Sequence, residues 1–110
     1  QDVAEVGACI LKAPEKWANQ TLDLTGPENL TMTDIVRTVS EKTGEMLTFI
    51  DETVEEAYQS RKRWPAQDWE YDAWVSTYTA IKAGEQAGVS SDVESVLGRP
   101  ATSLRDLLSP

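Results

Sequence analysis

The stretch from Thr21 to Ile50, TLDLTGPENLTMTDIVRTVSEKTGEMLTFI, decides the predicted fold. Its first five residues alternate polar and apolar side chains and lead into a Gly-Pro pair, which is typical of a short strand followed by a turn. Thr31, with Asp34 three residues later, then predicts a capped helix that ends at Gly44. Residues 47–50 predict a second strand. The stretch is therefore predicted to be a βαβ unit with two short parallel strands.

Two parallel strands are too few to make a stable sheet, and parallel strands are normally buried on both faces. The predicted βαβ unit is therefore incomplete by itself. It needs further strands from a missing segment or from a second copy of the chain. We accordingly expect a homodimer, or an association with the missing segment, in which the strand edges and apolar faces are covered.

The rest of the chain is predicted to be helical. Residues 2–12 carry apolar side chains at helical spacing, and the sequence beyond residue 53 predicts about four further helices, the longest from about Gln67 to Glu85. The predicted fold class is thus α/β and helix-rich. We expect residues 1–110 to form a single domain or subdomain, with a leading helix at 1–13, the βαβ unit at 21–50 and a helical lid at 53–110.

The balance of charge is acidic. Ten Lys and Arg residues stand against nineteen Asp and Glu residues, which gives a formal net charge of −9. Such a surface repels phosphate backbones and anionic lipids, so nucleic acid and membrane partners are not expected. No apolar run approaches the roughly 20 residues that cross a bilayer, and no signal peptide is visible. We therefore expect a cytoplasmic location. The single Cys9 cannot form an internal disulfide.

The sequence offers no residues for the commonest catalytic sites. It contains no histidine, which removes the usual general base near neutral pH and the Ser-His type of triad. Its one cysteine and scattered carboxylates form no cluster with metal-ligand spacing. No glycine-rich phosphate loop is present. We predict no catalytic, metal-binding or cofactor-binding residue in this chain.

Aromatic residues are the strongest functional signal. Three of the four tryptophans fall between positions 64 and 74, and two tyrosines lie among or just after them. Large aromatic side chains with a polar edge suit a site for a small aromatic or apolar molecule. The alternative is that those on the main helical stripe simply form core. The predicted substrate-binding residues are Trp64, Trp69, Tyr71, Trp74 and Tyr78, and Arg61 or Arg63 is a candidate contact for an anionic group.

Four segments, taken in order, resemble the NmrA-like proteins, an atypical branch of the short-chain dehydrogenase/reductases. Residues 1–8, QDVAEVGA, resemble the family's Asp-(Val/Ile)-Ala helix start. Residues 22–31, LDLTGPENLT, resemble its strand, Gly-Pro-Glu turn and capped helix. Thr43 and Gly44, followed by residues 47–50, resemble its next glycine and strand. Residues 91–104, SDVESVLGRPATSL, resemble its closing Asp-Val and Gly-Arg-Pro motifs and short final helix.

The resemblance implies relatives that bind NAD(P) on a Rossmann core, among them quinone and imine reductases, fungal alkaloid reductases of secondary metabolism and non-catalytic redox-sensing regulators. It also implies a substrate cleft between that core and the C-terminal helices. The chain would be the C-terminal, substrate-side subdomain of such a Rossmann-type oxidoreductase. Because the glycine-rich loop is absent, NADP is expected only if a missing Rossmann portion is present.

Two other functions remain open from the sequence. The chain could be a stand-alone truncated paralogue that binds a small aromatic or apolar metabolite and speeds an isomerisation or cyclisation by holding its shape. It could also be a non-catalytic interaction or regulatory module that docks through its acidic surface and exposed tryptophans.

Overall fold

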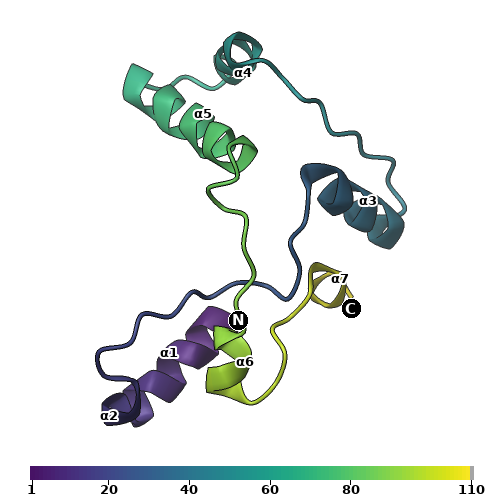
Figure 1. The fold of residues 1–110 in the computed structure, drawn as a ribbon. Helices are drawn as coiled ribbons and strands as arrows, with labels where there is room; N and C mark the ends of the chain where they lie inside the picture. The colour runs from purple at the N-terminus through teal and green to yellow at the C-terminus, as the bar shows by residue number, and fades with distance from the viewer. Residues whose placement is uncertain (110) are drawn as a thin grey trace. The chain divides into compact units, whose positions relative to one another are not determined.

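The computed structural model describes residues 1–109, and within them the chain forms helices joined by extended segments (Figure 1). It divides into two compact units. Unit 1 comprises residues 1–48 and 88–109, and unit 2 comprises residues 49–87. The helices of unit 1 are α1 (Asp2–Lys12), α2 (Pro14–Trp17), α3 (Met32–Thr43), α6 (Asp92–Leu97) and α7 (Leu104–Leu107). Those of unit 2 are α4 (Val54–Arg61) and α5 (Asp68–Lys82).

The predicted α/β fold class is wrong, because residues 1–109 contain no strand and therefore no βαβ unit. The segments predicted as strands, 21–25 and 47–50, have no regular secondary structure and pair with no neighbouring strand. The first is held instead by hydrogen bonds to the segment that leads into α6. The Asp23 backbone N–H donates to the Asp92 carboxylate at 2.8 Å, and the Ser90 backbone N–H donates to the Thr25 hydroxyl at 3.0 Å. These contacts replace the ladder that a parallel neighbour would provide.

Local sequence signals set the ends of the helices. At the start of α3, the Thr31 hydroxyl accepts the Asp34 backbone N–H at 3.1 Å, while the Asp34 carboxylate accepts the Thr31 backbone N–H at 3.1 Å. This reciprocal capping box was predicted, and Thr53 and Glu56 form another at the start of α4. Gly44 ends α3 in the left-handed conformation, with φ 75°, as predicted.

The core of unit 1 lies between α1 and α6, which pack against each other. Val6 of α1 and Val93 of α6 are its buried side chains, at 1% and 2% exposure. A second helix pair in the unit is made by α3 and α7. Apolar side chains elsewhere on α1 stay in solvent, since Val3 is 65% and Leu11 82% exposed. The apolar contact that holds α1 against α6 is therefore small.

An ionic network adds to this contact and joins distant parts of the chain. The Arg99 guanidinium donates to the Asp2 carboxylate at 2.9 Å and also pairs with Glu5. The Thr102 backbone N–H and hydroxyl donate to Asp2 at 2.6 and 2.8 Å. These bonds lower the pKa of Asp2 from 3.8 to about 2, with the Thr102 backbone bond as the largest cause and the Arg99 bond next. Charge-assisted bonds of this kind favour the ionised carboxylate.

This network predicts that the stability of unit 1 falls in acid. Asp2 is ionised in the folded chain at pH 3, whereas the unfolded chain holds its proton there, so protons favour unfolding. The contribution of Asp2 is complete above about pH 4 and is lost as the pH falls towards 2. Urea unfolding at several pH values should show this slope, and Asp2→Asn should make it shallower. An unchanged slope in Asp2→Asn would contradict the assignment.

Unit 2 is a hairpin of α4 and α5, which pack together. Its buried apolar side chain is Val75, at 3% exposure. Polar bonds hold the two helices in place. The Tyr58 hydroxyl donates to the Asp72 carboxylate at 2.8 Å, and this bond raises the pKa of Tyr58. The ion pair between Lys82 and Asp51, at 3.1 Å, ties the end of α5 to the segment before α4.

No helix within residues 1–109 has the length and apolar character needed to span a bilayer.

Candidate functional site

All five predicted substrate-binding residues lie in unit 2, and four of them form one group. Trp64 lies between α4 and α5, and Tyr71, Trp74 and Tyr78 lie on α5. We call these four side chains the aromatic surface. Trp64 is 52%, Trp74 38% and Tyr78 50% exposed, while Tyr71 is half-buried. The aromatic surface therefore presents ring faces and edges to solvent from a two-helix scaffold.

Tyr71 connects the members of the aromatic surface. Its hydroxyl donates to the Trp64 carbonyl at 2.9 Å and accepts the Ala66 backbone N–H at 3.2 Å, which fixes the segment between the helices. Its ring meets that of Trp74 edge to face, with centroids 5.6 Å apart and an interplanar angle of 82°. This is a favoured geometry for aromatic pairs. Tyr71 thus contacts both tryptophans, the Trp64 backbone through its hydroxyl and the Trp74 ring through its own ring.

Two arginines lie against the aromatic surface. The Arg63 guanidinium is 4.0 Å from the centroid of Trp64, and that of Arg61 is 5.2 Å from the centroid of Tyr78. Arg61 is also fixed by Glu52 at 3.2 Å and by the Ala57 carbonyl at 2.8 Å. A ring that stacks on the aromatic surface would meet positive charge at its edge, which suits a ligand carrying an electron-rich or anionic oxygen.

The structure places Trp69 apart from the aromatic surface. It lies nine residues before Tyr78 on the same helix, and nine steps of about 100° put the two on opposite sides of α5. Its indole N–H donates to the Gln67 side chain at 2.9 Å, and the residue is 65% exposed. The predicted five-residue site is therefore divided into four side chains that share a surface and one that does not.

Residues that the sequence analysis did not identify also shape unit 2. The bond from Tyr58 to Asp72 crosses between α4 and α5 and supports the helix that carries the aromatic surface. Nothing in the spacing of these two residues marks them as a pair, because they are 14 positions apart and lie on different helices.

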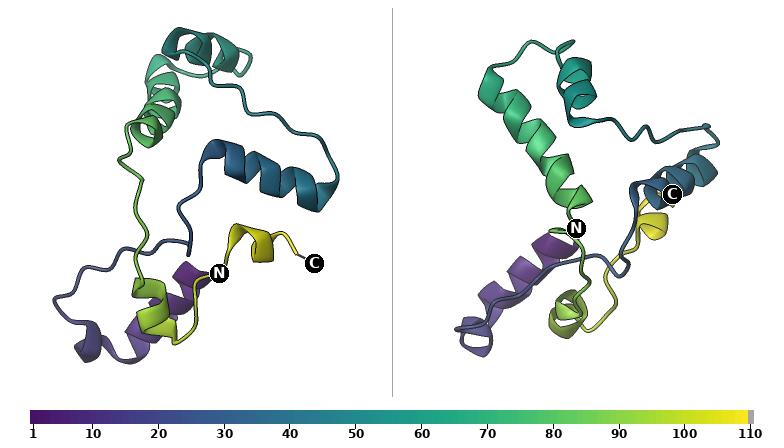
Figure 2. Two further views of the ribbon diagram at one scale, coloured as in Figure 1. Left: turned by 45° about the vertical axis from the view of Figure 1, so that its right-hand side comes forward. Right: turned by 45° about the horizontal axis from the view of Figure 1, so that its top comes forward.

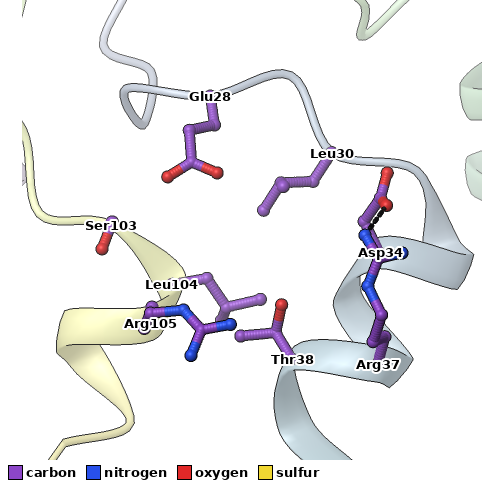
Figure 3. Close-up of a pocket in the computed structure, with 8 residues that line it drawn as sticks. All are labelled: Glu28, Leu30, Asp34, Arg37, Thr38, Ser103, Leu104 and Arg105. Carbon is purple, nitrogen blue, oxygen red and sulfur yellow. Dashed lines mark hydrogen bonds and ion pairs between the residues drawn. The ribbon is translucent and has the colours of Figure 1, made fainter. Parts of the chain in front are cut away.

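Unit 1 has a hollow of about 370 Å³ between the start of α3 and α7, with its lining residues shown in Figure 3. Leu30, Thr38 and Leu104 form its apolar side, and the carboxylate of Glu28 points into it. Four of the polar side chains around it, those of Asp34, Arg37, Ser103 and Arg105, are already engaged. Asp34 caps α3 and forms an ion pair with Arg37. The pKa of Asp34 is lowered, and the hydrogen bonds from Thr31 are the largest cause. The other lining residues are Ser103 and Arg105.

The aromatic surface is not enclosed by either of the two main hollows of the described structure. The hollow in unit 2 is an open depression on the side of α5 that carries small side chains, lined by Ser76, Thr77, Thr79, Ala80, Ala83 and Glu85. A ligand on the aromatic surface would therefore be bound on one side only, unless another polypeptide covers it.

The chemical groups present limit what the site can do. Residues 1–109 contain no group of three or more side chains placed to hold a metal ion. The aromatic surface and its two arginines supply stacking and cation–π contact as means of binding. Comparison with family models, with curated proteins and with solved structures gives no match for this chain.

Proposed function

We propose that the chain is the substrate-binding, C-terminal part of an NmrA-like NAD(P)-dependent reductase, and that the aromatic surface forms one wall of the substrate site. The ordered motifs described for the sequence support the family. The observation that carries the binding role is the gathering of Trp64, Tyr71, Trp74 and Tyr78 on one scaffold, with Trp64 52% and Trp74 38% exposed.

The amount of exposed surface supports a role as part of a larger site. Two separate compact units of these sizes would together expose roughly 7,200 Å². The chain exposes 8330 Å². The difference, about 1,100 Å², exceeds the roughly 800 Å² that one partner contributes to a standard interface. Covering the apolar part of this surface would stabilise an association between this chain and another polypeptide.

The residues of this chain do not fit NADP by themselves. The part of the chain described by the structure offers no glycine-rich turn leading into a helix N-terminus, which is what a pyrophosphate requires. No step of hydride transfer is therefore assigned to these residues. Their part is to stack a planar substrate, to orient it through the rings of Trp64 and Trp74, and to place its oxygen near Arg63.

The binding role is tested by titrating 1,4-naphthoquinone into the 110-residue chain by calorimetry. We expect Trp64→Ala to weaken binding about 5- to 10-fold, because one aromatic stacking contact contributes on the order of 1 kcal/mol. Trp17→Phe, a change in unit 1 away from the aromatic surface, is the matched control and should leave the affinity unchanged. Equal affinity in Trp64→Ala and the unsubstituted chain would overturn the binding role.

The reductase assignment has a separate test on the native protein. Its intact mass should exceed that of this chain by a nucleotide-binding portion, and the preparation should oxidise NADPH when 1,4-naphthoquinone is supplied. A native polypeptide of this length that still binds the quinone would refute the reductase assignment. It would favour the alternative, a stand-alone protein that binds a small molecule.

A further inference from the structure

Arg63 differs from the other arginines of the described chain because it has no acidic partner. Carboxylates pair with the remaining four, which are Arg37, Arg61, Arg99 and Arg105. Within residues 1–109 no ion pair is found for Arg63, although acids outnumber bases nineteen to ten in the sequence. The positive charge of Arg63 is therefore available to a ligand.

Arg63 lies in the short segment that joins α4 to α5, residues 62–67 (Figure 2). Its guanidinium lies over the Trp64 ring, 4.0 Å from the ring centroid. A guanidinium that stacks on a ring uses its face for that contact, which leaves the N–H groups at its edge for an acceptor. Because Arg63 is exposed, a molecule that packs against the aromatic surface can reach these N–H groups.

Arg61 is the other candidate for an anionic group, and its charge is already used. Its guanidinium pairs with the Glu52 carboxylate at 3.2 Å and donates to the Ala57 carbonyl at 2.8 Å. Its side chain is only 17% exposed. An anionic ligand at Arg61 would have to compete with the carboxylate of Glu52. The structure therefore favours Arg63 over Arg61 as the contact for an anion.

The sequence around Arg63 adds to the positive charge at this place. Residues 61–67, RKRWPAQ, contain three bases and no acid. A neutral carbonyl oxygen could accept a hydrogen bond from Arg63, but a hydrogen bond in which both partners are charged is stronger than one to a neutral group. A cation without a carboxylate partner therefore stabilises an anionic ligand more than a neutral ligand of the same shape.

We propose that Arg63 selects planar aromatic ligands that carry an anionic oxygen on the ring over neutral ligands of the same shape. The ring packs against the aromatic surface, and the anionic oxygen accepts from the N–H groups at the edge of the Arg63 guanidinium. This selection rests on the proposed binding role of the aromatic surface, to which it adds the class of ligand. It does not depend on the reductase assignment.

The test compares two quinones by calorimetry on the 110-residue chain at neutral pH. The hydroxyl of 2-hydroxy-1,4-naphthoquinone is acidic enough to be ionised there, so this quinone carries an anionic oxygen on its ring. The neutral quinone, 2-methoxy-1,4-naphthoquinone, has the same ring system without the charge. We expect the unsubstituted chain to bind the anionic quinone about fivefold more tightly, which is the scale of an exposed ion pair.

Two variants separate a contact with Arg63 from a general effect of charge. Arg63→Gln keeps hydrogen-bond donors but removes the charge, so it should bind the two quinones about equally, with the affinity for the neutral one unchanged. Lys62→Gln removes the same charge from the adjacent exposed residue, which also has no ion pair within residues 1–109. It should retain the preference for the anionic quinone.

The possible failures are distinguishable. Equal affinities of the unsubstituted chain for the two quinones would overturn the selection by Arg63 and leave the binding role of the aromatic surface in place. A preference that survives in Arg63→Gln, or that is lost equally in Lys62→Gln, would also overturn it. If neither quinone binds, the binding role itself is overturned, and the selection with it.

Discussion

Val6→Ala should lower the free energy of unfolding of unit 1 by about 2 kcal/mol. The change removes two buried methyl-sized groups at about 0.8 kcal/mol each, with a further cost for the cavity left behind. Val6 is 1% exposed and packs in the small contact between α1 and α6, where few neighbours can move in to fill the space. Marginal stability makes a loss of this size a large fraction of the whole.

The effect is measured by urea unfolding followed through hydrogen exchange of α1 and α6, which reports unit 1 separately from unit 2. Val3→Ala is the matched control, since it makes the same chemical change on the same helix at a position that is 65% exposed. It should alter the free energy by no more than about 0.5 kcal/mol. Equal effects of the two substitutions would contradict the placement of Val6 in the core.

Val75→Ala should leave unit 2 largely unfolded at 25 °C. The chemical change equals that at Val6, but Val75 is the buried apolar side chain of a unit that spans only residues 49–87. Units below about 40 residues are marginal without staples such as disulfides or metals. A loss of about 2 kcal/mol is therefore comparable with all the stability that the hairpin has.

Tryptophan emission reports this change, because Trp64, Trp69 and Trp74 all lie in unit 2, and Trp17→Phe removes the remaining signal from unit 1. The emission should shift towards that of exposed indole at lower urea concentration in Val75→Ala. Val54→Ala, at a site 54% exposed on α4, is the control and should keep the midpoint nearly unchanged. A midpoint for Val75→Ala that matches this control would show that polar bonds alone hold the hairpin.

Features that are determined locally could be predicted from the sequence. The capping pair of Thr31 and Asp34 and the glycine at position 44 act within a few residues of themselves, so their pattern can be read directly. The strands at 21–25 and 47–50 were predicted from equally local patterns, but a strand exists only with a neighbour. The alternation of polar and apolar residues cannot specify that neighbour, and residues 1–109 do not supply it.

In the candidate site, too, local features were predictable and contacts between distant residues were not. Tyr71, Trp74 and Tyr78 were predicted as site residues, whereas nothing in their pattern indicated that Val75 is the buried side chain of α5. Val75 is buried between α5 and α4, whereas the rings of Trp74 and Tyr78 stay partly in solvent. The bond from Tyr71 to the Trp64 carbonyl depends on how the chain returns after α4. The network of Arg99 with Asp2 joins residues 97 positions apart, and no short pattern marks it.

The pairing of α1 with α6 has a consequence for how the protein is made. Val6 and Val93 lie at opposite ends of the chain, so a ribosome completes all of unit 2 before α6 emerges. The contacts between α4 and α5 join residues that are near in sequence, so they can form early. The contact between α1 and α6 joins residues far apart in sequence and therefore forms more slowly. During synthesis the apolar side chains of α1 that contact α6 therefore stay exposed until α6 has emerged. Exposed apolar surface of this kind is what chaperones bind.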